Sequence, residues 1–502
     1  MTGEDARPTQ RRPSPDPALT RRLREVEREI FARRPEHAVE PTLDRITALA
    51  TLLGDPQRAY PVIHVTGTNG KTSTARMIET LLRARGLRTG LFTSPHLSNV
   101  RERIVVDGEP LPVEAFLASY DDVAPYVALV DERGPLRLSF FEVLTAMAFA
   151  AFADAPVDVA VIEVGLGGTW DATNIADGAV AVETPISIDH TRYLGSTIEE
   201  IAGEKAGIIK PGAVAILGQQ PLAAAEVLLR RVAEVGATVA REGIDFGVVA
   251  RELAVGGQLI TVRGLAGEYH DLLLPLFGEY QATNAACALA AVEAFGGAPA
   301  GALGEELDDV TAAAGRAEPG PLGEDLVREA FLAMTSPGRL EVVRRSPVVI
   351  VDSAHNPAGM AASLEAVAEA FSFRTLIVVL AISEDKDVPA VLDQLEPAAD
   401  GLVVTRNSSD RSMDPGKLAD LAAEVFGPDR VRAADRLDDA IEAAVGLADE
   451  AAADGLGGSG VLVTGSVVTA GDARSLLGAG DDADGGGGRG GRDGFREGAD
   501  PR

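Results

Sequence analysis

A short glycine-containing segment, Gly67-Thr68-Asn69-Gly70-Lys71-Thr72, lies between an apolar run at residues 62–65 and a helix-forming stretch at residues 72–85. In such a strand–loop–helix unit, glycines let backbone N–H groups close around phosphate oxygens, and the helix N-terminus adds partial positive charge. Lys71 would reach the terminal phosphates, and the Thr72 hydroxyl would ligate Mg²⁺ or bond a phosphate. The segment therefore predicts a nucleotide site on a parallel α/β sheet.

The loop departs from the general phosphate-loop pattern at one position. That pattern places a glycine five residues before Gly70, whereas this chain has Val65 there. A Gly-Lys-Thr triplet alone is weak support, and the alternative is an ordinary glycine-rich turn. The flanking strand and helix favour nucleotide binding.

Strand and helix patterns alternate through most of the chain, which predicts a mainly parallel sheet covered on both faces. Ser196 and Glu199 have the spacing of a capping box, for a helix that ends at Gly207. Residues 239–275 show short alternating stretches with glycines, which predict a small antiparallel sheet. We expect strands at 62–65, 89–92, 157–164 and 180–188, and helices at 17–33, 42–53, 72–85 and 141–153.

The predicted fold class is α/β, with a phosphate-loop domain carrying the small antiparallel sheet and a second, smaller, Rossmann-like α/β domain. A stretch rich in Pro, Gly and charge separates the two. The expected divisions are a disordered N-terminus at 1–16, a central ATP-binding domain at 17–325, a linker at 326–337, a C-terminal domain at 338–477 and a disordered Gly/Asp-rich tail at 478–502.

The composition limits the partners and the compartment. The net charge of −30 comes from 46 basic and 76 acidic residues, and such a surface repels nucleic acid and anionic membranes. The single cysteine, Cys287, allows no intrachain disulfide, which fits a reducing compartment. No apolar run approaches the roughly 20 residues of a membrane helix. We expect a cytoplasmic monomer that binds neither nucleic acid nor membranes.

Further motifs follow the phosphate loop in order, from about residue 40 to residue 475. With them, the chain resembles the folylpolyglutamate synthase/dihydrofolate synthase family of the Mur ligase superfamily. The motifs are Thr93-Ser94-Pro95-His96-Leu97, Glu163-Val164-Gly165-Leu166-Gly167-Gly168, Asp171-Ala172-Thr173-Asn174, Asp189-His190-Thr191, Glu204-Lys205-Ala206-Gly207, Gln281-Ala282-Thr283-Asn284, Pro337-Gly338-Arg339-Leu340-Glu341, Asp352 with Ala354-His355-Asn356-Pro357, Asp385-Lys386-Asp387 and Thr464-Gly465-Ser466.

The resemblance implies an ATP-dependent ligase that works through an acyl phosphate. ATP phosphorylates a carboxylate, and the amino group of L-glutamate then displaces phosphate. The acceptor is dihydropteroate, the terminal γ-carboxylate of a reduced folate, or both. Phosphoryl transfer of this kind depends mainly on positioning and charge neutralisation.

The resemblance also implies a metal site. Ser94, Glu163, Thr72 and His190 match its Mg²⁺ ligands, and oxygen ligands with one neutral His suit that ion. Lys205 matches a lysine that is carbamylated and helps to hold a metal, although a lysine near a helix C-terminus can simply complement the helix dipole. Lys71, Lys205 and His190 are the expected catalytic residues. The resemblance further allows a monovalent cation.

The remaining implied sites concern the nucleotide and the pteroate. The nucleotide contacts are Gly67, Thr68, Asn69, Gly70, Lys71, Thr72, Asn284, Arg339, Asp352 and His355, with Arg339 meeting phosphate and Asp352 the ribose. The pteroate or folate residues are Glu40, Pro41, Thr42, Leu43, Ser139, Phe140, Phe141, Glu142, Trp170, Asp171 and Ala172. Phe140, Phe141 and Trp170 could stack on a flat ring, and the two phenylalanines could equally be core residues.

Three positions depart from the family's pattern. Thr169-Trp170 replaces Arg-Leu before Asp171, so a cation is missing beside the expected acceptor site. Tyr280 replaces a His, and Ser353 replaces a Gly. None of these changes removes a metal or phosphate group.

Two other functions remain open from the sequence. A peptidoglycan Mur ligase would carry a substrate-binding domain before the loop, and only about 65 residues precede it here. A non-catalytic nucleotide-binding protein would explain the loop, but not Lys205, His190 or the motifs of the second domain.

Overall fold

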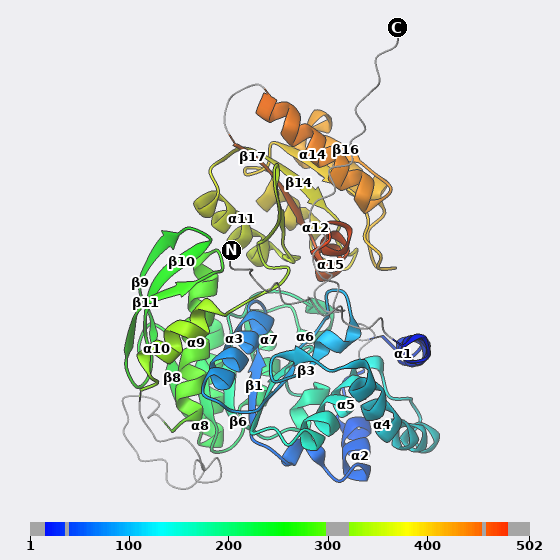
Figure 1. Cartoon of the computed structure of the whole chain (residues 1–502), viewed down its shortest axis with the longest axis vertical. Coiled ribbons are helices and arrows are strands. Elements are labelled where there is room, and N and C mark those ends of the chain that lie inside the picture. The colour runs from blue at the N-terminus through cyan, green and yellow to red at the C-terminus, as the bar shows by residue number, and fades with distance from the viewer. Residues whose placement is uncertain (1–15, 36–39, 298–320, 454–457, 480–502) are drawn as a thin grey trace, which may run out of the picture.

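The computed structural model describes residues 16–35, 40–297, 321–453 and 458–479. Most of the predicted disordered termini therefore lies outside the described residues. Two α/β domains form this structure, and the second stands above the first in Figure 1. No helix in the described ranges is long and apolar enough to cross a membrane.

The first domain is built on an eight-stranded sheet in the order β4-β3-β2-β5-β1-β6-β7-β8. The strands from β2 to β8 in this order run parallel, whereas β3 and β4 are antiparallel additions at one edge. The strands are β1 (Val62–Thr66), β2 (Thr89–Phe92), β3 (Ile104–Val106), β4 (Glu109–Pro110), β5 (Val159–Glu163), β6 (Gly178–Glu183), β7 (Val214–Leu217) and β8 (Thr238–Arg241).

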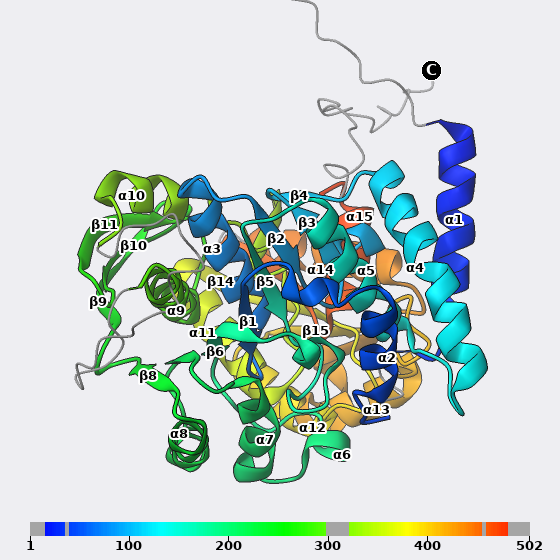
Figure 2. The same cartoon turned by 90° about the horizontal axis from the view of Figure 1, so that it is seen from below.

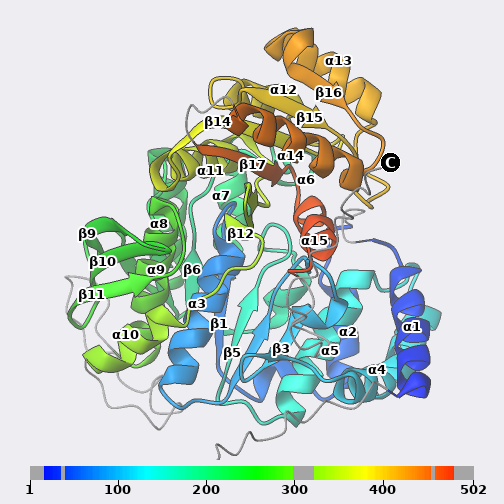
Figure 3. The same cartoon turned by 45° about the horizontal axis from the view of Figure 1, so that its top comes forward.

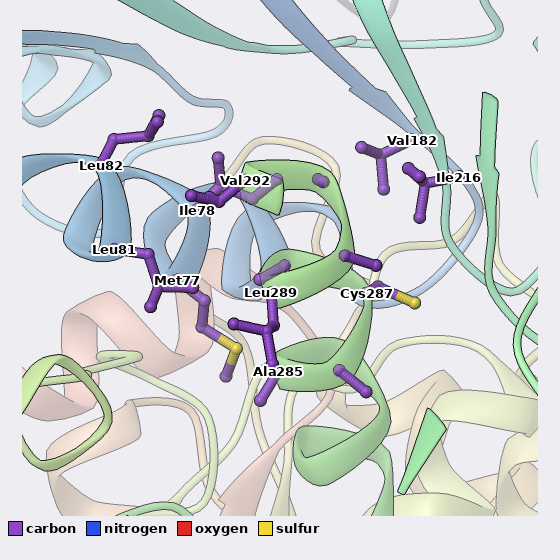
Figure 4. Close-up of a cluster of buried hydrophobic side chains, with 14 of the residues drawn as sticks. Met77, Ile78, Leu81, Leu82, Val182, Ile216, Ala285, Cys287, Leu289 and Val292 are labelled. Carbon is purple, nitrogen blue, oxygen red and sulfur yellow. The ribbon is translucent and has the colours of Figure 1, made fainter. Parts of the chain in front are cut away.

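Helices cover both faces of this sheet. The helices of this part of the chain are α1 (Pro17–Phe31), α2 (Asp44–Leu52), α3 (Lys71–Ala84), α4 (Val113–Arg133), α5 (Phe140–Asp154), α6 (Thr191–Leu194), α7 (Ile198–Lys205), α8 (Leu222–Val235), α9 (Glu279–Phe295) and α10 (Glu324–Leu332). On one face α3 packs against α9, with Met77 and Leu81 close to Leu289 (Figure 4). On the other face lie α5 and α7, and α1 stands at the periphery beside α4 (Figure 2).

The predicted antiparallel sheet is confirmed. It consists of β9 (Gly247–Ala254), β10 (Gly257–Arg263) and β11 (Glu268–Leu274) in the order β11-β10-β9. Its inward residues Ile260 and Leu272 are buried in the same core as α3, α9 and α10. The α/β fold class, with a mainly parallel sheet and a separate antiparallel one, matches the prediction.

Two local predictions need correction. The capping box of α7 is formed by Thr197 and Glu200, one residue later than Ser196 and Glu199, because the Thr197 side chain accepts the Glu200 N–H and the Glu200 carboxylate returns to the Thr197 N–H. The stretch placed as a linker at 326–337 begins inside α10. This helix packs its apolar face on α3 and β11, so the connection between the two sheets is shorter than expected.

The second domain contains a six-stranded sheet in the order β12-β13-β17-β14-β15-β16, which is parallel except for the edge strand β12. It lies over the end of the first sheet from which the phosphate loop emerges (Figure 3). Its elements are β12 (Glu341–Arg345), β13 (Val348–Val351), α11 (Pro357–Ala370), β14 (Phe373–Leu380), α12 (Val388–Leu395), β15 (Gly401–Val404), α13 (Pro415–Phe426), β16 (Val431–Ala433), α14 (Leu437–Ala453), β17 (Gly458–Thr464) and α15 (Val467–Leu476).

Candidate active site

A cleft of about 1630 Å³ separates the two domains. Its walls are the loops that follow β1, β2, β5 and β6 of the first domain and β13, β14 and β17 of the second. Ligands of open α/β sheets bind at the carboxyl ends of the strands, and here two sheets present those ends to one space. The volume exceeds the 300–1,000 Å³ that is common for one small ligand, so the cleft has room for more than one substrate.

The phosphate loop connects β1 to α3 and requires glycine at two positions. Gly67 has φ 141° and Gly70 has φ 90°. A Cβ on Gly67 would lie 1.9 Å from Thr184 Oγ1, and one on Gly70 would lie 2.5 Å from Asn284 Oδ1. No side chain caps the N-terminus of α3, so its first N–H groups remain available to an anion.

Two lysines contact the backbone of this loop. Lys71 Nζ donates to the Thr68 carbonyl at 3.1 Å, and Lys205 Nζ donates to the Gly67 carbonyl at 2.7 Å. Burial and the positive charge of Lys71 lower the pKa of Lys205 to about 7. Burial likewise lowers the pKa of Lys71, although the charge of Glu163 opposes the shift.

Glu163 ends β5 with a side chain that is 1% exposed. Its carboxylate accepts hydrogen bonds from Thr72 Oγ1 at 2.8 Å and from the Ser94 N–H at 3.1 Å. Burial raises the pKa of Glu163, while the charge of Lys71 and these two hydrogen bonds oppose the shift. Three predicted metal ligands, Thr72, Ser94 and Glu163, therefore lie together at the carboxyl edge of the sheet.

His190 immediately precedes the short helix α6 and has a left-handed backbone, φ 51°. Its ring lines the cleft, where desolvation lowers its pKa to about 3, so the ring is neutral at physiological pH. Behind the loop, a cavity of about 20 Å³ is bordered by Gly67, Lys71, His190 and Lys205, among others. That space suffices for about one water molecule or ion.

The nucleotide residues expected from the second domain lie across the cleft from the loop. Arg339, Asp352 and His355 all line the cleft, as does Asn284 of the first domain. The Asp352 carboxylate is only 2% exposed and accepts hydrogen bonds from the Leu340 and Ala354 N–H groups and from Ser363 Oγ. Through its bond to the Leu340 N–H, Asp352 holds the backbone next to Arg339 in place, whether or not it also contacts a ribose.

Most of the predicted pteroate residues reach the cleft, but three do not. Glu40, Thr42, Ser139, Phe141, Glu142, Trp170, Asp171 and Ala172 line it, whereas Pro41, Leu43 and Phe140 are absent from its wall. Phe140 stacks on Phe31 at 5.3 Å between ring centroids and lies under Arg103. Its suggested stacking on a substrate ring is therefore not supported, because its ring faces the α1 side of the domain.

Several cleft residues carry interactions that sequence reasoning did not find. Arg45 Nε donates to Glu142 Oε1 at 3.0 Å, and Arg34 Nη1 donates to Glu40 Oε2 at 2.5 Å, so two cations stand at the pteroate end. Glu183 ends β6 fully buried, and its carboxylate oxygens have no hydrogen-bond partner in the described part of the chain. Glu163 is predicted because an acidic residue at the end of an apolar strand lies at the carboxyl edge of the sheet, and the same pattern applies to Glu183.

Family models match both domains. The Mur ligase middle domain matches residues 65–292, and the Mur ligase glutamate ligase domain matches residues 338–467. The dihydrofolate synthase/folylpolyglutamate synthase of Mycobacterium tuberculosis is 50% identical over 485 residues, which cover 93% of this chain and 96% of that protein. The corresponding Escherichia coli protein is 34% identical over 360 residues, 71% of this chain and 76% of its own length.

Solved structures agree with these sequence matches. The M. tuberculosis folylpolyglutamate synthase complexed with ADP superposes with a TM-score of 0.85 at 50% identity, covering 92% of this chain and 99% of that chain. A complex of a folylpolyglutamate synthase with AMPPCP and folate gives a TM-score of 0.73 at 31% identity, covering 91% and 99%.

Proposed function

This chain belongs to the dihydrofolate synthase/folylpolyglutamate synthase family of Mur ligases, and we propose that the interdomain cleft is where ATP activates a pteroate or folate carboxylate for L-glutamate. The chain is an ATP-dependent ligase that adds glutamate to dihydropteroate, to the terminal γ-carboxylate of reduced folates, or to both. The main support for this site is the hydrogen bond between Thr72 and Glu163. It lies beside the phosphate loop, and Arg339 lines the same cleft.

The reaction has two steps. A carboxylate oxygen of the acceptor attacks the γ-phosphorus of ATP, which gives an acyl phosphate and ADP. The glutamate nitrogen then attacks the carbonyl carbon, a tetrahedral intermediate expels phosphate, and the nitrogen loses a proton as the amide forms. Both steps gain from positioned cations, because negative charge gathers on the transferring phosphoryl group.

We assign the nucleotide to the first half of the cleft. The uncapped N-terminus of α3, the loop at Gly67–Thr72 and Lys71 would hold the β- and γ-phosphates, and Asn284 would stand beside them. Arg339 would contribute a second cation from across the cleft when the domains are closed. Asp352 and His355 would line the nucleoside side.

The residues at the end of β5 fit Mg²⁺. The ion prefers oxygen ligands and keeps part of its shell for water and phosphate. Thr72, Ser94 and Glu163 supply protein oxygens, and the neutral His190 ring could complete a site. When bound, Mg²⁺ neutralises charge on the phosphates.

Carbamylation of Lys205 is part of the proposal. Only an unprotonated amine reacts with CO₂, and burial that brings the pKa of Lys205 to about 7 leaves a large unprotonated fraction near neutral pH. Lys205 also borders the small cavity behind the loop, together with Gly67, Lys71 and His190. Intact-mass measurement under bicarbonate, with Lys205→Met as control, tests the modification.

The monovalent cation stays a prediction. A dependence of turnover on K⁺ would test it.

The pteroate end of the cleft would bind the acceptor. Phe141 and Trp170 offer flat faces, and the Arg45–Glu142 pair supplies polar contacts for the heterocycle. We also propose that the protein is a cytoplasmic monomer. Its single cysteine, Cys287, is buried and free, which fits the reducing conditions of the cytoplasm.

The deciding experiment offers the purified protein dihydropteroate and tetrahydrofolate separately, with ATP, Mg²⁺ and glutamate, and identifies the products by mass. Product from dihydropteroate alone indicates a synthase, product from tetrahydrofolate alone a polyglutamylating enzyme, and product from both a bifunctional one. ADP that forms equally fast without glutamate would contradict the ligase assignment.

A further inference from the structure

Asp189 is a first-domain residue whose side-chain partners come largely from the second domain. Its Oδ1 accepts a hydrogen bond from Lys386 Nζ at 2.7 Å. Its Oδ2 accepts one from Asn356 Nδ2 at 3.1 Å and lies 3.4 Å from His355 Nε2. The loops before α11 and α12 of the second domain therefore meet on a single carboxylate of the first.

This carboxylate is paired with a cation of the second domain in a largely buried place, because Lys386 Nζ lies 2.7 Å from Asp189 Oδ1. The side chains of Asp189 and Lys386 are 8% and 9% exposed. Removing one partner by mutation would leave the other as an uncompensated buried charge while the domains are closed, so the loss of either residue should disfavour the closed arrangement.

The same carboxylate is tied to the predicted catalytic loops. The His190 N–H donates to Asp189 Oδ1 at 2.7 Å, next to the left-handed backbone of His190. Asn356, which contacts Asp189, also donates to Asn69 Oδ1 of the phosphate loop at 3.1 Å. Opening the domains would break the contact of Asn356 with Asn69, and it would take the second-domain partners away from the carboxylate that accepts the His190 N–H.

We propose that Asp189 is a positioning residue that couples closure of the second domain to the placement of His190 and the phosphate loop. It acts through Lys386 and Asn356 and contacts no reacting atom. The inference rests on the proposed function, since this placement matters for catalysis only if phosphoryl transfer takes place at the loop. A second ion pair between the domains, Arg251 with Glu369, joins β9 to α11 away from the cleft and provides a comparison.

The test is a double-mutant cycle on the full chain with Asp189→Asn, Lys386→Gln and the double variant. We expect each single variant to lower kcat about 10- to 100-fold, and the double variant to be no slower than the slower single one, because the two residues act as one unit. KM for ATP should change less than about threefold, since the first domain supplies most phosphate contacts. If the substitutions only destabilised the fold, they would lower the melting temperature and the fraction of active protein, and the kcat losses would not show this non-additive relation.

Closure itself is measured by fluorescence energy transfer. Dyes on cysteines introduced at the exposed positions Asp122 and Asp420 report the separation of the domains, because the native Cys287 is buried. With ADP and Mg²⁺ added, wild type should show a high-transfer state that both single variants populate less. The matched control Arg251→Gln should keep kcat within about twofold of wild type.

Two results would overturn the coupling. Multiplicative losses in the double variant would mean that Asp189 and Lys386 act independently. The second result is a low kcat in Asp189→Asn together with a normal energy-transfer efficiency and a normal kcat in Lys386→Gln. In that case Asp189 would support only His190 and would not couple the domains. Failure of wild type to form glutamylated product would instead contradict the proposed function, and the transfer measurements would still decide the coupling.

Discussion

Thr72 Oγ1 donates a hydrogen bond to Glu163 Oε1 at 2.8 Å, which joins the first turn of α3 to the carboxyl end of β5. The bond brings a phosphate-loop hydroxyl and a buried carboxylate to one point. Ser94 reaches the same carboxylate through its N–H from the end of β2. Three separate strand–loop connections thus converge where the terminal phosphates of ATP are expected.

Replacing Glu163 by Gln should cost at least about 100-fold in kcat, comparable with the loss of one preorganised electrostatic contact. The amide keeps the shape but removes the charge that would attract Mg²⁺, so half-maximal turnover should need more Mg²⁺. A magnesium titration of turnover measures both effects. The control is Glu79→Gln, since Glu79 is equally buried but bonds Thr89 and Arg83 away from the cleft. Unchanged magnesium dependence in Glu163→Gln would remove Glu163 from the metal site.

Replacing Lys71 by Ala should abolish turnover and leave the fold intact. The ammonium group makes one backbone contact, to the Thr68 carbonyl, so its loss should change stability little while removing a cation from the phosphates. We expect a kcat/KM loss of about 10²- to 10³-fold or more. Steady-state kinetics and a thermal melt measure the two quantities, and retained turnover would exclude Lys71 from the phosphate site.

Local patterns predicted the parts of the site that one strand and its loop determine. The phosphate loop and Glu163 both follow apolar strands, and residues at such ends share one sheet edge whatever the rest of the fold. The contact of Asp189 with Lys386 joins positions 197 residues apart and depends on how two domains dock, which no local pattern contains. Phe140 and Phe141 are neighbours in sequence, yet only Phe141 reaches the cleft, since helix packing decides the direction of each.

The capping-box error has a similarly local origin. Ser196 with Glu199 and Thr197 with Glu200 satisfy the same spacing rule, and the sequence offers both. The chain uses the later pair, in which the Glu200 carboxylate accepts from the N–H groups of both Ser196 and Thr197. Two donors are satisfied by one side chain, which favours this register.

Trp170 should govern affinity for the acceptor. Its side chain lines the cleft. Trp170→Ala should raise KM for dihydropteroate about tenfold or more, with a smaller effect on KM for ATP, because a stacking face worth about 1–1.5 kcal/mol and its buried area are lost. Trp170→Phe keeps an aromatic ring but lacks the indole N–H, so its KM for dihydropteroate should lie between those of wild type and Trp170→Ala. Equal changes in both KM values would indicate a general disturbance of the cleft.

His64 should make the first domain sensitive to mild acid. It lies in the middle of β1, fully buried, with Nε2 2.9 Å from Thr173 Oγ1, and Thr173 in turn donates to Asp171 Oδ1. Burial and the charge of Lys210 lower the pKa of His64 to about 3, whereas an unfolded histidine titrates near 6.5. Above that value neither state is protonated. As the pH falls from about 6.5 towards 3, only the unfolded state gains the proton, so stability is lost.

The loss should approach about 1.4 kcal/mol for each pH unit inside this window, or on the order of 2 kcal/mol between pH 6.5 and pH 5. His64→Gln removes the titrating ring and keeps a polar side chain, so wild type should lose more stability than the variant on acidification. Urea unfolding of both proteins at pH 7 and pH 5 measures this difference. If the difference in unfolding free energy between wild type and His64→Gln is the same at both pH values, His64 is not the buried neutral group described. If the unfolding free energy of wild type falls relative to that of His64→Gln on acidification, the acid sensitivity belongs to the buried ring of His64.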